Sequence, residues 1–190
     1  MEPDRLILDL CGGTGSWSRP YMEHGYTVVV IDPWVNGLSV VGFSTKAEVH
    51  GILAAPPCTD FSSSGAQFWT VKDHDGRTAK SVLVVLECLR IIKECRPKWW
   101  CLENPVGRLP KFIGQPVASF DPCEFGDPWT KKTCLWGSFN FPKRSRVYPT
   151  VSMSRHNSPE RYGEKLGISR ARARAVTPCG FARAFFEANP

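Results

Sequence analysis

The sequence lacks any apolar run near the ~20 residues that a membrane-spanning helix needs. Residues 1–5 lead directly into a strand-like segment, so we expect no secretory signal. None of the eight cysteines forms a C-x-x-C pair, the spacing that is typical of zinc sites. No internal repeat is present. These absences favour a single domain without metal, with reduced thiols, in the cytoplasm and away from membranes.

Acidic residues are scarce in one part of the chain. Residues 138–176 hold nine Lys and Arg against two acids, a net charge of +7, whereas the whole chain has a net charge of +6. The rest of the chain is therefore close to −1. A near-neutral body with one basic segment is typical of a protein that binds a polyanion. A solvated basic loop without a partner is the alternative interpretation.

Strand-like and helix-like segments alternate along the chain. Strands are expected at 5–10, 26–31, near 47–49, at 51–55 and at 99–102, and helices at 16–24, 78–94 and 181–188. Segments 119–125 and 133–136 are expected to form a terminal antiparallel pair, and 59–77 a mobile loop. This order predicts an α/β fold with a doubly wound, mostly parallel sheet, in which the strand at 26–31 is buried on both faces.

Three loops with chemically useful residues follow three of the predicted strands. The run 51–55 ends at two prolines, and Cys58 follows directly. Residues 12–15 and 103–105 follow two other strands. A lone cysteine is more often a buried structural residue. However, loops at the carboxyl ends of parallel strands meet at one edge of the sheet, where α/β folds place their ligands. This convergence makes Cys58 a candidate nucleophile.

Glu103 is the second candidate catalytic residue. A thiolate such as that of Cys58 can add to C6 of a pyrimidine when a protonated carboxyl group hydrogen-bonds to ring N3, and C5 can then attack a methyl donor. The apolar neighbours Trp100 and Leu102 are expected to raise the pKa of Glu103 and keep it protonated. A salt-bridged acid at a strand end is the alternative interpretation.

The glycine-rich turn at 11–15 suits a nucleotide-like cofactor. Glycines let the backbone approach a ligand, and Asp32 at the end of the next strand is placed to hold ribose hydroxyl groups. The third glycine of the dinucleotide fingerprint is missing. Its absence argues against a nicotinamide or flavin cofactor and leaves S-adenosylmethionine open.

Taken in order, these loops resemble the motifs of the DNA cytosine-5 methyltransferase family, and most closely its small phage-type members. The resemblance is carried by Asp9-Leu10-Cys11-Gly12-Gly13-Thr14-Gly15, Pro57-Cys58-Thr59-Asp60-Phe61-Ser62, Glu103-Asn104-Pro105, residues 125–133, and Arg174-Ala175-Val176-Thr177-Pro178. It covers about residues 5–137 and 174–188. Trp129 and Thr133 stand where the family has Gln and Arg, and Lys131 replaces another Arg.

The resemblance implies a Rossmann-like class I S-adenosylmethionine-dependent methyltransferase fold. It also implies methyl transfer to C5 of cytosine in DNA through a covalent Cys58–C6 adduct. Glu103 would be the N3 partner, Asn104 would order the loop, and Lys131 would lie near the cytosine. The cofactor S-adenosylmethionine would be bound by Asp9, Cys11, Gly13, Gly15, Asp32, Pro33 and Pro56, with Pro33 or Trp34 packed on the adenine.

The sequence departs from the family in one acid and in size. No acid precedes the strand at 51–55, where the family has one that contacts the adenine amine. Between a catalytic core at 1–137 and a returning helix at 177–190, only residues 138–176 remain for target recognition. Because so short a segment cannot form an independent domain, we expect relaxed or short sequence preference, or help from a protein partner. Contacts to DNA are expected from Ser62, Lys132, Lys143, Arg144, Arg146, Arg170, Arg172 and Arg174.

The substrate is expected to be duplex DNA with a flipped cytosine, or a single strand, in a bacterial or phage-infected cell. The same chemistry on a free deoxycytidine nucleotide is one alternative. A catalytically silent relative that binds DNA or serves as a subunit is another, and the substitutions at Trp129 and Thr133 keep it open. A cysteine hydrolase is disfavoured, because none of the histidines lies in a recognisable partner motif. These histidines are His24, His50, His74 and His156.

Overall fold

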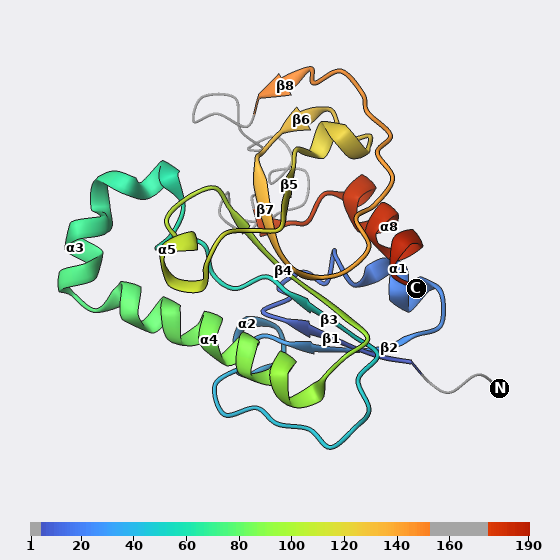
Figure 1. Cartoon of the computed structure of the whole chain (residues 1–190), viewed down its shortest axis with the longest axis horizontal. Helices are drawn as coiled ribbons and strands as arrows, with labels where there is room; N and C mark the ends of the chain where they lie inside the picture. Colours follow the sequence, from blue (N-terminus) through green and yellow to red (C-terminus); the bar gives the residue numbers. More distant parts are fainter. Residues whose placement is uncertain (1–4, 153–174) are drawn as a thin grey trace.

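The computed structural model describes residues 5–152 and 175–190. Within these residues a six-stranded sheet has the order β2-β1-β3-β4-β7-β5, and β6 and β8 form a separate pair (Figure 1). The strands are β1 (Leu6–Leu10), β2 (Thr27–Ile31), β3 (Gly51–Ala54), β4 (Trp99–Pro105), β5 (Ala118–Phe120), β6 (Trp129–Thr130), β7 (Thr133–Ser138) and β8 (Val151–Ser152). The α-helices are α1 (Arg19–Glu23), α2 (Pro33–Asn36), α3 (Trp69–His74), α4 (Arg77–Cys95), α5 (Pro110–Ile113) and α8 (Cys179–Ala188). Two 3-10 helices are η1 (Ser63–Phe68) and η2 (Pro122–Phe125).

The sheet is parallel on one side and antiparallel on the other. Strands β2, β1, β3 and β4 run parallel in register, with Leu10 opposite Ala54 and Ala54 opposite Leu102. Strand β7 pairs antiparallel with both β4 and β5. This arrangement confirms the predicted α/β fold with a mostly parallel sheet and the predicted terminal antiparallel pair. It also brings the carboxyl ends of β1, β3 and β4 to one edge.

Helices cover both faces of the sheet. Alternate residues of each strand point to opposite faces, and the buried side chains divide accordingly into two clusters. On one face, Leu8 and Ile52 pack in a cluster with Val85 of α4. Helices α1 and α8 lie against the other face of the sheet (Figure 1). There, Ile7 and Leu53 belong to an aromatic cluster whose members include Trp17, Tyr21, Phe181 and Phe185. The two clusters confirm the doubly wound arrangement.

Four local predictions were wrong. Strand β2 lies at the edge of the sheet, so its residues are partly exposed rather than buried on both faces. No strand forms near 47–49. The segment 59–77 is not a plain loop but contains η1 and α3. The first helix is also shorter than predicted, because the Ser18 hydroxyl is engaged by Asp9 and by the Gly15 carbonyl, and α1 begins only at Arg19.

Candidate active site

The loop that carries Cys58 is tied to the end of β4. The side-chain amide of Asn104 donates to the Pro56 carbonyl over 3.0 Å, and Asn104 is fully buried. Ala54, at the end of β3, lies opposite Leu102 of β4, and Glu103 is the next residue of that strand. The structure therefore brings the Cys58 loop and Glu103 to the same edge of the sheet, as the sequence predicts.

Cys58 starts a tight turn that docks on the loop after β4. Its side chain is half-buried, and its carbonyl accepts from the backbone N–H groups of Phe61 and Ser62 at 3.0 and 2.9 Å. The Phe61 carbonyl in turn accepts from the backbone of Arg108 at 2.9 Å. At Gly107 a Cβ atom would stand 1.9 Å from the Phe61 oxygen. Only glycine therefore permits this close approach of the two loops.

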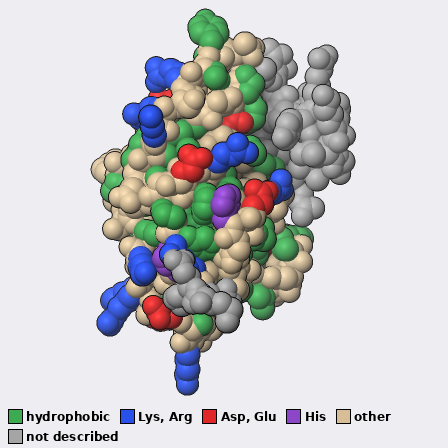
Figure 2. Space-filling model, turned by 90° about the vertical axis from the view of Figure 1, so that its right-hand side faces the viewer, with side chains coloured by type: hydrophobic (Ala, Val, Ile, Leu, Met, Phe, Trp, Pro, Cys, Tyr) green, Lys and Arg blue, Asp and Glu red, His purple; other side chains and the backbone are tan. Residues whose placement is uncertain are grey.

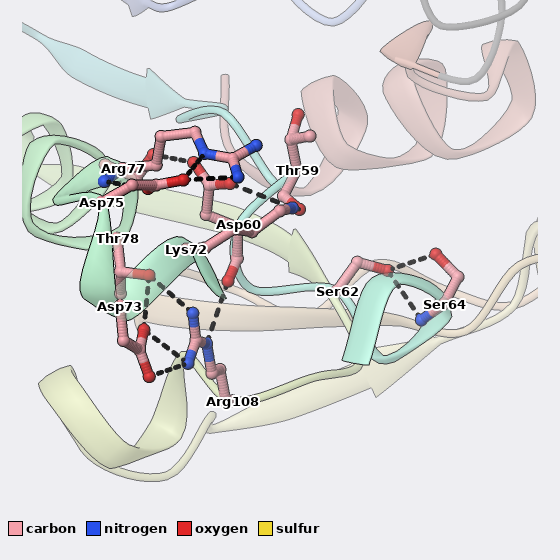
Figure 3. A network of polar contacts seen from close by, with 11 residues as sticks. Thr59, Asp60, Ser62, Ser64, Lys72, Asp73, Asp75, Arg77, Thr78 and Arg108 are labelled. Carbon is pink, nitrogen blue, oxygen red and sulfur yellow. Dashed lines mark hydrogen bonds and ion pairs between the residues drawn. The ribbon is translucent and has the colours of Figure 1, made fainter. Parts of the chain in front are cut away.

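A buried polar network holds the residues that follow Cys58 (Figure 3). Lys72 of α3 is 5% exposed, donates to the Thr59 carbonyl and pairs with the Asp60 carboxylate at 3.0 Å. Arg108 donates to the Asp60 carbonyl at 2.9 Å. The same guanidinium reaches Asp73 at 2.9 Å and Thr78 at 2.7 Å. The turn at Cys58 is thus braced by both α3 and the loop after β4.

Sequence reasoning missed Lys72 and Arg108. The segment 59–77 has no apolar period, because its helix is fixed by charges rather than by a hydrophobic stripe. The charged residues themselves carried the only available signal. Lysine and arginine are almost never fully buried without a partner. Lys72 can therefore be buried only because it pairs with Asp60, and this pair holds α3 against the turn at Cys58.

Glu103 lines a small cavity on the α8 face of the sheet. The cavity is walled by Glu103, Phe120, Lys131, Thr133, Thr177, Pro178 and Phe181. Burial raises the pKa of Glu103 above its ordinary value, and the nearby Lys131 charge opposes this shift without cancelling it. A raised pKa favours the protonated form of a carboxyl group. The structure thus places Lys131 close to Glu103, and residues 177–178 return from the far end of the chain to close the pocket.

The glycine turn after β1 is joined to the end of β2. Asp32 accepts from the backbone N–H of Gly13 at 3.0 Å and of Trp34 at 2.8 Å. Cys11, Gly13 and Gly15 all have positive φ, with values of 56°, 53° and 66°. No atom lies within 4 Å of the point where a Gly13 Cβ would stand. The turn is therefore open to a ligand beside a carboxylate.

Two features near this turn fit S-adenosylmethionine. The Trp34 side chain is 89% exposed and presents an aromatic surface beside Asp32. Asp9 is fully buried, and its Oδ1 atom has no hydrogen-bond partner within the part of the chain that the structure describes. The ammonium group of a bound methionine moiety would supply the missing donor. Pro33 is exposed beside Trp34, and Pro56 is buried at the Asn104 contact.

Asp9 is the most strongly perturbed acid of the turn. Ser18 Oγ donates to Asp9 Oδ2 over 2.5 Å. Burial raises the pKa of Asp9 to about 7, while the Ser18 hydrogen bond opposes this shift and Asp32 adds to it. At Gly12 a Cβ would stand 2.4 Å from the Asp9 carboxyl carbon. Gly12 and Asp9 therefore pack so closely that neither position can enlarge.

We expect the stability of the protein to fall between about pH 4 and pH 7 because of Asp9. In this window folded Asp9 keeps a proton that the unfolded chain has lost, so rising pH favours unfolding. Full ionisation would cost on the order of 4 kcal/mol. The free energy of unfolding is measured in urea at pH 4 and at pH 8. From pH 4 to pH 8 it should fall less for Asp9→Asn than for the wild type. The exposed Asp75→Asn should show nearly the same fall as the wild type. An equal pH slope in Asp9→Asn and wild type would contradict the burial argument.

Some of the predicted DNA-binding residues lie in the described part of the chain, and the others lie outside it. Arg144 and Arg146 share the Glu124 carboxylate at 3.3 and 2.7 Å, and Lys132 lies 3.8 Å from Asp121. Lys143 follows β7, and Ser62 caps η1 four residues after Cys58. The remaining predicted residues lie outside the described part of the chain; they are Arg170, Arg172 and Arg174.

Two other kinds of feature are absent from the described residues. Residues 5–152 and 175–190 contain no group of three His, Cys, Asp or Glu side chains that could hold a metal ion. None of the helices in these ranges combines the length and apolar character of a membrane span.

Comparison with known proteins gives a family match over the region that holds both candidate catalytic residues. Residues 40–111, which include Cys58 and Glu103, match the family model of C-5 cytosine-specific DNA methylase. No curated protein matches the chain. A structure described as a putative DNA modification methyltransferase encoded within an E. coli prophage has 14% sequence identity and a TM-score of 0.54, and the match covers 78% of this chain and 53% of that one. A methyltransferase of Entamoeba histolytica, EhMeth, has 13% identity and a TM-score of 0.46 over 80% of this chain and 58% of that one.

The two kinds of match carry different information. The family model confirms the resemblance over the segment that holds both candidate catalytic residues. At 14% identity, the prophage structure confirms the methyltransferase-like fold alone. This chain spans about half the length of that protein.

Proposed function

We propose that this chain, whose segment 40–111 carries the pattern of the C-5 cytosine-specific DNA methylase family, transfers a methyl group from S-adenosylmethionine to C5 of cytosine in DNA. One observation carries the proposal. The loop of the candidate nucleophile Cys58 is held by Asn104, the neighbour of Glu103, a half-buried carboxyl group whose pKa is raised. A nucleophile and an acid at one edge are what an addition to the pyrimidine ring requires.

The first step is addition of Cys58 to the ring. The thiolate Sγ forms a bond to C6, and electron density moves through the ring toward N3. Glu103, protonated because its site disfavours the carboxylate, donates to N3 and stabilises this charge. Lys131 lies close enough to influence Glu103, and we assign it to the electrostatic stabilisation of the same site.

The later steps restore the ring. When bound, S-adenosylmethionine would supply an electrophilic methyl group to C5, its S–CH3 bond would break, and the neutral thioether S-adenosylhomocysteine would leave. A base then removes the C5 proton, the electron pair reforms the C5–C6 double bond, and the Sγ–C6 bond breaks to release the Cys58 thiolate. The proton on N3 returns to Glu103, so that the enzyme leaves the cycle unchanged.

The glycine turn would hold the cofactor. We assign Cys11, Gly13, Gly15 and the buried Asp9 to the methionine part, and Asp32 to the ribose hydroxyl groups. Pro33 and Trp34 would contact the adenine, and Pro56 would border the methyl group. The open space at Gly13 and the exposure of Trp34 support this assignment.

The basic region would bring the DNA to this site. We assign residues 138–176 to backbone contacts, with Ser62 and Lys132 near the flipped base, because Lys and Arg bind phosphates without reading sequence. Relaxed or short sequence preference follows, unless a protein partner adds recognition. The proposed setting is the cytoplasm of a bacterial or phage-infected cell.

A labelling experiment tests the proposal. The protein is incubated with methyl-labelled S-adenosylmethionine and, in parallel, with duplex DNA, single-stranded DNA and deoxycytidine monophosphate, and the bases are then analysed. Label at C5 of cytosine in DNA is the expected result. Label only in the free nucleotide would show that the substrate is a nucleotide and not DNA. DNA binding without any label would indicate a catalytically silent relative that binds DNA.

A further inference from the structure

A groove of about 530 Å³ lies beside the Glu103 pocket, between α8 and the loop that follows β7. Its cationic side chains are Lys143 and Arg144 from the loop and Arg183 from α8. The other lining residues are Phe125, Ser145, Cys179, Gly180, Ala184 and Glu187. Figure 2 views the side of the molecule on which α8 lies, and Lys and Arg side chains project from the upper left edge of this face.

Two of these cations form no ion pair within the described residues, although the acidic Glu187 also lines the groove. Neither Lys143 nor Arg183 forms an ion pair or side-chain hydrogen bond there, and Arg183 is exposed. Arg144 is shared between Glu124, at 3.3 Å, and the face of Phe141, at 4.8 Å from the ring centroid. Three positive groups around one concavity, on a body that is otherwise near neutral, favour an anionic ligand.

The groove is fixed relative to the Glu103 pocket by the start of α8. Cys179 and Gly180 line the groove, whereas Thr177, Pro178 and Phe181 line the pocket. Gly180 donates its backbone N–H to Asp127 at 3.0 Å. A Cβ at Gly180 would stand 1.8 Å from the Phe125 carbonyl oxygen, so α8 can approach η2 this closely only with glycine there. A single turn of helix therefore separates the two concavities.

We propose that this groove binds the phosphodiester backbone of the DNA strand next to the nucleotide in the Glu103 pocket, an inference that rests on the proposed function. Because residues of the start of α8 line both concavities, a strand that places one base beside Glu103 can carry a flanking phosphate past the first turn of α8 into the groove. Lys143, Arg144 and Arg183 then neutralise phosphates without contacting base edges, which positions the strand and leaves its sequence unread. Glu187, one helical turn after Arg183, opposes this attraction.

Removing positive charges from the groove, and separately removing its negative charge, tests whether the groove binds DNA. Affinity for a fluorescent duplex and for a single-stranded oligonucleotide is measured by anisotropy at several salt concentrations, with Lys143→Ala/Arg183→Ala, Glu187→Gln and wild type. The double variant should bind about 10-fold to 100-fold more weakly and lower the slope of log K against log salt by about 1.8 for duplex DNA, because two phosphate contacts are lost. Glu187→Gln should bind more tightly than wild type.

A matched control separates the groove from net charge. Lys80→Ala/Lys93→Ala removes the same two charges from the exposed side of α4 and should leave the salt slope nearly unchanged. If both double variants weaken DNA binding equally, or if a poly-glutamate peptide competes at this groove better than DNA does, the proposal is overturned. Circular dichroism checks folding, and Glu187→Gln supplies the opposite sign should the double variant be unstable.

The outcomes also separate this inference from the proposed function. Methyl transfer by wild type together with an unchanged salt slope in the groove variant would reject the groove and keep the enzyme. A groove-dependent loss of DNA binding without methyl transfer would keep the groove as a DNA site and reject the enzyme.

Discussion

Replacing Cys58 with alanine is expected to abolish methyl transfer, with a loss of at least about 10⁴-fold in kcat, because removal of a covalent nucleophile leaves only binding and electrostatic effects. The substitution removes a half-buried sulfur atom from a turn that backbone hydrogen bonds hold in place. We therefore expect the affinity for DNA and for S-adenosylmethionine to stay near the wild-type values. Methyl transfer to DNA and binding by anisotropy and calorimetry measure these two effects separately.

The matched control is Cys95→Ala, which removes a thiol from the end of α4, outside the candidate site. It should retain full activity. Wild-type protein should also form an adduct with DNA containing 5-fluorocytosine that survives denaturation, since fluorine cannot leave C5 as a cation, and Cys58→Ala should form none. Methyl transfer by Cys58→Ala, or an adduct formed through another residue, would show that the mechanism is wrong.

The sheet could be predicted from the sequence because its strands carry local signals. The runs that became β1, β3 and β4 are mostly apolar, with Asp9 in β1 and Glu103-Asn104 at the end of β4 as exceptions, as strands in the middle of a sheet require. Strand β2 has the same composition but lies at the edge of the sheet. The pattern of apolar residues shows which side chains a strand can bury. The position of that strand in the sheet depends on which other strands pair with it, and those strands lie elsewhere in the sequence.

The candidate site could be predicted in part for the same reason. Cys58 follows the apolar strand β3, and Glu103 follows the apolar part of β4, so the topology alone brings them to one edge. The side chains that brace them come from distant parts of the chain. Lys72 and Arg108 meet at Asp60 only after η1, α3 and the loop after β4 have folded, and Thr177 reaches the Glu103 pocket from beyond the basic segment. Pairings of this kind leave no periodic trace in the sequence.

Replacing Glu103 with glutamine is expected to lower kcat by about 10²-fold to 10⁴-fold, the range that a positioned general acid contributes. An amide can still donate a hydrogen bond to N3, but it cannot transfer a proton to the ring as negative charge develops there. The half-buried position tolerates a neutral amide because desolvation already disfavours the Glu103 carboxylate. Thermal unfolding should therefore show a folded variant, and the loss should appear in kcat rather than in the affinity for DNA.

The pH dependence of kcat ties this loss to the proton of Glu103. Because burial raises the pKa of Glu103, the wild-type rate should fall as the pH rises through that raised pKa, and Glu103→Gln should lack this descending limb. Lys131 acts in the opposite direction on the same pKa. Lys131→Ala should therefore move the limb to higher pH, while Lys132→Ala, which removes an equal charge paired with Asp121, should leave it in place. If Glu103→Gln keeps the same descending limb, the titrating group is not Glu103. Glu103 would then not act as the acid, because removing the acid must also remove the pH dependence that its proton causes.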